Sequence, residues 1–184
     1  MRKLSDISVT NKTVALRADL NVPVKEGIIL DDSRIEAVIP TVKYLLTKNC
    51  KIILMSHFGR PKAGTFDPQA SLQPIARRIG EMLNQEVDFI SAIKDVKFKS
   101  TISLLENTRF LIGELENNEE LSKNLGSMAE VYVFDAFGTA HREQASTFGA
   151  IYQANVSCAG LLLEAEIEAL TKAIHSNDKP LLSI

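Results

Sequence analysis

Four short apolar runs stand out along the chain, and each one breaks off into a polar cluster. The runs are residues 14–18, 52–55, 102–105 and 131–134. Short runs of this kind, alternating with helical patterns, are typical of parallel strands in an open α/β sheet. The polar clusters would then share one edge of the sheet, outside the carboxyl ends of the strands, where such sheets bind ligands.

Helical spacing of apolar residues fills the segments between these runs. Asp31–Ser33 offer capping oxygens to a first helix, Ser71 caps a second, and Asn117 to Glu120 open a third. A fourth, strongly amphipathic helix is predicted over 160–175, and a further strand over 87–90. The alternation predicts an α/β fold, a three-layer Rossmann-like domain with a mostly parallel sheet.

Composition narrows the class of protein. The 184 residues suit one domain with a full core, and 45% apolar content with 24% charge indicates a globular chain. A net charge of −2 argues against a nucleic-acid partner, because nucleic-acid affinity comes largely from neutralising phosphates. No apolar run approaches the roughly 20 residues that span a bilayer, so we expect a cytoplasmic protein without a membrane partner. Cys50 and Cys158 form no CxxC motif and are expected to be buried thiols.

Arginines are the main candidates for chemistry. Arg60, Arg109 and Arg142 each lie just past a predicted strand, Arg34 lies in the first turn of the first helix, and His141 precedes Arg142. The planar guanidinium matches the oxygens of phosphate and carboxylate groups. A single surface arginine is usually only solvated, but three at equivalent positions indicate a site for a small, highly anionic molecule.

Three other polar residues leave alternatives open. His57 directly follows a strand, and it either contacts the ligand or forms a hydrogen bond within its own loop. Asp19 and Asn21 alternate on an extended segment and so point the same way. Asp19 either accepts a hydrogen bond from a ligand hydroxyl or only holds an arginine in place. Asp135 is expected to order the histidine and arginine that follow it, His141 and Arg142.

Familiar catalytic motifs are absent from the sequence. It contains no GxGxxG, GxxxxGK[ST], HExxH or GxSxG pattern. The chain therefore shows neither a nucleotide-binding loop nor an activated nucleophile, and no metal site is expected in it. A site made chiefly of arginines is suited to positioning a substrate and stabilising its charge.

Taken together, five segments resemble the phosphoglycerate kinase family in order and spacing. They are residues 17–23, 31–35, 56–61, 106–110 and 135–142. Ala18, Leu20 and Phe58 stand where the family usually has Val, Phe and Leu, which are conservative apolar changes. The resemblance implies a two-domain glycolytic enzyme that transfers a phosphoryl group between 1,3-bisphosphoglycerate with ADP and 3-phosphoglycerate with ATP. The amino-terminal half would bind 3-phosphoglycerate and the carboxy-terminal half Mg-ATP or Mg-ADP.

The resemblance also implies residue roles. The 3-phosphate would be bound by His57, Arg60, Arg109 and Arg142. Asp19 and Asn21 would lie near the 2-hydroxyl and carboxylate of the substrate, and Leu20, Phe58 and Gly59 would also line the substrate site. Arg34 would be catalytic, neutralising the phosphoryl group in transfer.

The chain is expected to comprise a phosphoglycerate-binding domain over 1–159, an interdomain connector helix over 160–175, and the start of a nucleotide-binding domain over 176–184. The apolar run at 180–184 resembles a strand cut off after it starts, although a chance apolar terminus explains it equally well. On the family pattern the natural protein continues and is monomeric, and this half alone is inactive. A stand-alone anion-binding module without catalysis is the alternative.

Overall fold

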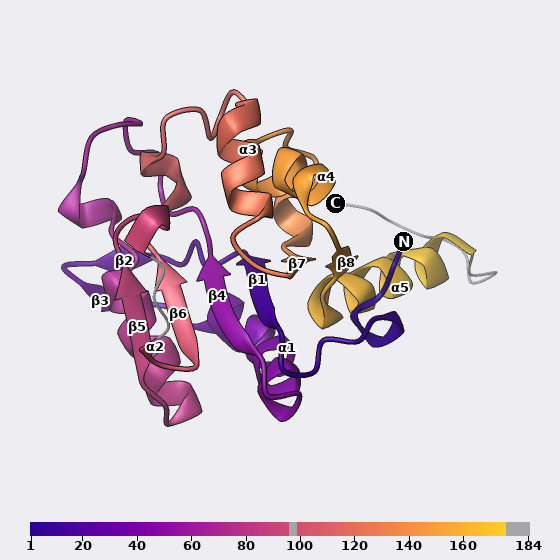
Figure 1. Ribbon diagram of the computed structural model, residues 1–184. Coiled ribbons are helices and arrows are strands. Elements are labelled where there is room, and N and C mark those ends of the chain that lie inside the picture. Colours follow the sequence, from indigo (N-terminus) through magenta and orange to yellow (C-terminus); the bar gives the residue numbers. More distant parts are fainter. Residues whose placement is uncertain (96–98, 176–184) are drawn as a thin grey trace.

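A six-stranded parallel sheet forms the centre of the computed structural model, which describes residues 1–95 and 99–175 (Figure 1). The strands lie in the order β5-β6-β4-β1-β7-β8. They comprise β1 (Thr13–Ala18), β4 (Lys51–Met55), β5 (Val87–Ile90), β6 (Ile102–Leu105), β7 (Val131–Asp135) and β8 (Ser157–Ala159). A small antiparallel pair, β2 (Val24–Lys25) and β3 (Ile28–Ile29), lies apart from it. The expected α/β class and all five expected strands within the described residues are confirmed, whereas β8 and the small pair were not predicted.

Helices cover both faces of the sheet, giving three layers (Figure 1). The helices are α1 (Ser33–Thr47), α2 (Gln73–Leu83), α3 (Glu119–Gly126), α4 (Ala150–Gln153) and α5 (Leu161–His175). Val14 and Leu16 of β1 pack in one core with α1 and α2, whereas Ala15 packs in a second core with α3 and α4. Because successive side chains of a strand point to opposite faces, each strand supplies both cores.

Short turns of 3-10 helix connect several elements, and one of the connections is π-helical. The 3-10 turns are η1 (Leu4–Asp6), η2 (Pro68–Ala70), η3 (Ile93–Asp95), η4 (Thr108–Phe110) and η5 (Phe137–Thr139), and the π-helical turn is η6 (Ala145–Gly149). Two of them, η4 and η5, follow β6 and β7 directly, so they lie at the carboxyl edge of the sheet.

Side-chain oxygens begin the helices close to the expected positions. The Asp31 carboxylate accepts a hydrogen bond from Ser33 N (2.8 Å), and the Asn118 side chain accepts one from Leu121 N (3.0 Å). The Ser71 hydroxyl accepts one from Gln73 N (3.2 Å), although Leu72 occupies the capping position itself. Each bond satisfies an amide that the first turn of a helix leaves without an intrahelical partner.

The order of the strands places a switch point between β1 and β7. The chain passes from β1 to β4 on one side, completes β5 and β6, and then crosses back to β7 on the other side of β1. Loops that leave the carboxyl ends of β1 and β7 therefore diverge, which opens the crevice in which such sheets bind ligands. The expected strand over 180–184, like the whole of 176–184, lies outside the described residues.

Two further expectations concern cysteines and membranes. Cys50 and Cys158 are both buried and free, as expected. Among the described residues, no helix combines the length and the apolar character needed to cross a bilayer.

Candidate anion-binding site

Buried polar residues fasten the loops after β4 and β6 to each other. The Asn107 side chain accepts hydrogen bonds from Phe58 N and Arg109 N (both 3.0 Å) and donates to the carbonyls of Phe58 and Ala70 (2.7 and 2.8 Å). The Ser56 hydroxyl accepts a bond from Leu20 N (2.9 Å), which adds the loop after β1. These bonds join the backbones of the loops after β1, β4 and β6 at the carboxyl edge of the sheet.

Arg109 is a buried cation at this edge with few hydrogen-bond partners. It is 9% exposed, its Nε has no hydrogen-bond partner in the described part of the chain, and its Nη2 makes one long contact with Gln144 Oε1 (3.4 Å). Burial lowers the pKa of the Arg109 guanidinium, and the positive charges of Arg142, Arg17 and Arg60 lower it further against the opposing charge of Glu114. A buried, underpartnered cation among other cations lacks its counter-charge, and an anionic ligand would supply it.

His57 lies in the same positive field. Its side chain is 4% exposed, and burial together with the charges of Arg17, Arg109, Arg142 and Arg34 lowers its pKa to about 3. The ring is therefore neutral at physiological pH. His141, which precedes Arg142, is exposed.

Arg17 was not predicted as a site residue. It is completely buried in β1, its Nε donates to Ser146 Oγ (2.9 Å), its Nη1 donates to the Ala18 carbonyl, and its Nη2 lies 3.3 Å from His57 Nδ1. A charged residue inside an otherwise apolar strand was the signal that could have revealed it, because such a charge must be paired.

Arg34 and Asp19 form an ion pair at the mouth of the site. The Asp19 carboxylate thus holds an arginine, and its Oδ1 lies 4.0 Å from His57 Nδ1. Asn21 Oδ1 accepts a hydrogen bond from Gly59 N (2.9 Å), so this side chain ties the loops after β1 and β4 together. The positive φ of Gly59 (58°) is a backbone conformation that favours glycine.

A cavity of about 270 Å³ opens beside the ion pair. It lies between the start of α1, the η5 turn and α5, and Asp19, Arg34, Phe137, Leu162 and Glu166 are among its lining residues. Burial raises the pKa of Glu166, and the charges of Asp135 and Asp19 raise it further. The cavity thus combines one exposed cation with two carboxylates, and none of its lining residues is His57, Arg60, Arg109 or Arg142.

The remaining expected site residues differ in accessibility. Arg60 and Gly59 are exposed, and Arg142 is half-buried. Leu20 and Phe58 are buried in the core shared with α1 and α2, so only their backbone atoms can meet a ligand.

The expectation that Asp135 orders His141 and Arg142 is wrong. Its carboxylate accepts hydrogen bonds from Thr41 Oγ1 (2.5 Å) of α1 and from Leu163 N (2.8 Å) of α5. Asp135 follows Val131 and Val133 at the strand period of two, which directs it to the face that α1 covers rather than toward the basic cluster. It therefore anchors the first turn of α5 to the sheet.

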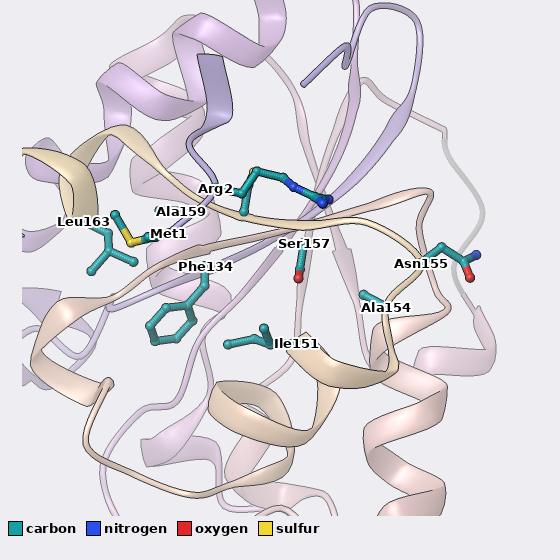
Figure 2. A pocket seen from close by; sticks show the side chains of 10 residues that line it. Met1, Arg2, Phe134, Ile151, Ala154, Asn155, Ser157, Ala159 and Leu163 are labelled. Carbon is teal, nitrogen blue, oxygen red and sulfur yellow. The ribbon is translucent and has the colours of Figure 1, made fainter. Parts of the chain in front are cut away.

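A second cavity, of about 450 Å³, lies elsewhere on the molecule (Figure 2). It is enclosed by the first two residues, β7, β8 and the segment around α4, and Phe134, Ile151 and Leu163 line it. Arg2 is the one arginine in its lining. An apolar cavity with one arginine is not suited to a highly charged anion, so the basic cluster is the better candidate site.

Comparison with known proteins agrees with this geometry. The family model described as phosphoglycerate kinase matches residues 4–184. The chain is 45% identical to the phosphoglycerate kinase of Desulfovibrio desulfuricans over 183 residues, covering 99% of this chain and 47% of that protein. It is 46% identical to the enzyme of Francisella tularensis subsp. holarctica, again covering 47% of the relative. The chain thus spans about half the length of the curated relatives that it matches.

Solved structures show the same correspondence. The phosphoglycerate kinase of Coxiella burnetii superposes with a TM-score of 0.91 at 42% identity, covering 97% of this chain and 46% of that one. The enzyme of Pyrococcus horikoshii gives a TM-score of 0.84 at 37% identity, covering 98% and 47%. Since the family model spans nearly all of the sequence and the fold agrees along the same length, the chain belongs to the phosphoglycerate kinase family.

Proposed function

We propose that this chain binds 3-phosphoglycerate at the carboxyl edge of its sheet, as one half of a phosphoglycerate kinase. The observation that carries the proposal is the buried, underpartnered guanidinium of Arg109 among further cations. A phosphate group would accept hydrogen bonds there and neutralise the cluster. A stand-alone anion-binding module has the same arginines, but membership of a kinase family disfavours it.

The substrate would lie with its two charged ends apart. His57, Arg60, Arg109 and Arg142 would bind the 3-phosphate, with Arg17 behind them. Asp19, Asn21 and Arg34 would meet the hydroxyl and carboxylate end, where the cavity of about 270 Å³ opens. Leu20, Phe58 and Gly59 would contribute only backbone contacts.

Phosphoryl transfer would need a second substrate from outside this chain. The acyl-phosphate bond of 1,3-bisphosphoglycerate breaks, the phosphoryl group passes to ADP, and 3-phosphoglycerate leaves as a carboxylate. We propose that Mg-ATP and Mg-ADP bind to the part of the full-length relatives that this chain does not cover. Arg34, exposed at the mouth of the site, would neutralise the phosphoryl oxygens in the loose transition state.

The helix α5 would act as the interdomain connector. It contributes Leu162 and Glu166 to the cavity beside Arg34, and Asp135 anchors its first turn. A displacement of α5 would therefore change the wall of the substrate cavity. On this proposal residues 1–159 form the binding domain, and the chain alone catalyses no transfer.

Calorimetric titration of the 184-residue chain tests the proposal. We expect 1:1 binding of 3-phosphoglycerate, weaker binding of glycerate, which lacks the phosphate, and no binding of ATP at the affinity of an intact kinase. An oligonucleotide serves as the polyanion control. Equal affinities for glycerate and 3-phosphoglycerate, or a preference for the oligonucleotide, would refute the assignment.

A further inference from the structure

Arg17 has a hydrogen-bond partner for each of its three nitrogens although its side chain is fully buried. Nε donates to Ser146 Oγ (2.9 Å), Nη1 donates to the Ala18 carbonyl, and Nη2 lies 3.3 Å from Nδ1 of His57. The guanidinium is thereby fixed in one orientation, with one of its N–H groups directed at the imidazole ring.

The chemistry of the two side chains decides the direction of the contact between them. A guanidinium has only donors and keeps its charge in proteins, so the lone pair of His57 Nδ1 must accept the bond. A neutral imidazole carries one proton, which must then lie on Nε2. The other acceptor close to Nδ1, Asp19 Oδ1, is 4.0 Å away, which is beyond hydrogen-bond distance.

We propose that Arg17 is a positioning residue that holds His57 as the tautomer protonated on Nε2, so that this ring gives the anionic substrate a hydrogen-bond donor rather than a positive charge. The proposal rests on the function proposed above for the identity of the anion. The hydrogen bonds of His57 run through Nδ1 and its backbone carbonyl, which leaves the proton on Nε2 available to a ligand oxygen.

The charges around His57 favour the same neutral state. One carboxylate and four guanidinium groups act on the ring, and they come from Asp19, Arg17, Arg34, Arg109 and Arg142. Burial and these cations keep the pKa of His57 near 3. A donor fixed in advance needs no reorganisation when the phosphate arrives, which is the general advantage of preorganised polar groups.

Ser146 and Glu114 hold Arg17 from the far side. The Ser146 hydroxyl accepts from Arg17 and donates to Glu114 Oε1, while Ser146 N donates to Glu114 Oε2 (3.0 Å). Glu114 is 1% exposed and its charge opposes the desolvation of the guanidinium. Replacing Arg17 alone would therefore strand a buried carboxylate, and a test must neutralise both residues together.

Nitrogen-15 NMR of the imidazole rings tests the proposal on the unmodified chain. The three histidines are assigned with His141→Gln and His175→Gln variants. At pH 6.5 without ligand, we expect an Nε2-to-Nδ1 proton ratio at His57 of about ten or more, as a hydrogen bond from a charged donor would impose. A His57 ring protonated mainly on Nδ1, or on both nitrogens, would overturn the proposal.

Two variants separate positioning from a general structural role. The double variant Arg17→Met with Glu114→Gln removes the donor without stranding a charge, and we expect the Nδ1 tautomer of His57 to increase at least several-fold. Glu114→Gln alone, the matched control, keeps the Arg17 donor and its Ser146 contact and should leave the tautomer ratio unchanged. An unchanged ratio in the double variant would show that Arg17 does not set the tautomer, and if that variant fails to fold, the unmodified chain decides.

Ligand addition distinguishes this proposal from the proposed function. When calorimetry detects 3-phosphoglycerate binding, the proton on His57 Nε2 should shift and the Nδ1 signal should stay that of an acceptor. Binding without any response at Nε2 would contradict the donor role. Absence of binding would refute the proposed function alone, because the tautomer ratio is measured on the free chain.

Discussion

Removal of the Arg109 charge should strengthen the fold while it weakens substrate binding. Arg109 is 9% exposed, its Nε lacks a partner within the described chain, and three neighbouring arginines repel it. Methionine has a similar length and adapts to irregular apolar surroundings. A buried polar group without a hydrogen-bond partner destabilises the folded state by about 1–3 kcal/mol, and the long contact with Gln144 offsets little of this.

We therefore expect Arg109→Met to raise the free energy of unfolding by about 1–2 kcal/mol, because it removes a buried donor that has no hydrogen-bond partner. For a chain of this size the melting temperature should rise by roughly 2–8 °C. Affinity for 3-phosphoglycerate should fall roughly 10- to 100-fold, because hydrogen bonds to charged groups contribute about 1.5–3 kcal/mol. Urea unfolding, with and without ligand, measures both effects on the same protein.

Arg77→Met is the matched control. Arg77 is exposed on α2 and is not among the cations that act on His57 or Arg109. Its replacement should change stability by no more than about 0.5 kcal/mol. Inorganic phosphate should stabilise the parent chain and the control by mass action but leave Arg109→Met nearly unaffected. A less stable Arg109→Met, or one stabilised by phosphate as much as the parent, would refute the reasoning.

Three further outcomes follow from other residues. The free energy of unfolding should rise by up to about 1.4 kcal/mol per pH unit between about pH 3 and 6.5, because in this range His57 is protonated in the unfolded chain but not in the folded chain. Urea titrations at several pH values measure this slope, and His57→Gln should reduce it. In a full-length protein that contains both domains, Arg34→Ala should lower turnover more than it lowers substrate affinity. A change confined to KM would instead make Arg34 an ordinary binding residue. Gly59→Ala should lower the free energy of unfolding by about 1–2 kcal/mol, because the positive φ of this residue disfavours any side chain. Gly160→Ala places its Cβ 2.2 Å from Asp135 Cγ and should lower the free energy of unfolding by about 3 kcal/mol or more. Thermal unfolding measures both changes.

The strands at the centre of the sheet were predictable because parallel strands are buried on both faces and read as continuous apolar runs. Strand β8 was missed for the opposite reason. Its three residues, Ser157–Ala159, include no β-branched or aromatic side chain, and the strand forms through pairing with β7 and a bridge to Lys3. Pairing with distant segments leaves no local pattern, so a single sequence does not reveal it.

The candidate site was predictable in part, because topology alone brings the carboxyl ends of parallel strands together. That argument locates loops but not the direction of side chains within strands. Arg17 and Asp135 lie near the ends of neighbouring strands, yet Arg17 turns toward the layer of Ser146 and Asp135 toward α1. Only the register of β1 against β7, together with the strand period of two, separates these two environments.

The net charge of −2 conceals how strongly charge is segregated in this molecule. Five of the eight arginines, Arg17, Arg34, Arg60, Arg109 and Arg142, act on one another or on His57. Two carboxylates oppose them, since Asp19 pairs with Arg34 and the charge of Glu114 acts on Arg17 and Arg109. Because the local excess is positive and partly buried, the proposed ligand, a small multivalent anion, would offset repulsion among the arginines that solvent screens only weakly. On the proposed function, a compact phosphate ester would reach Arg109, which is 9% exposed, more readily than the phosphates of a duplex would.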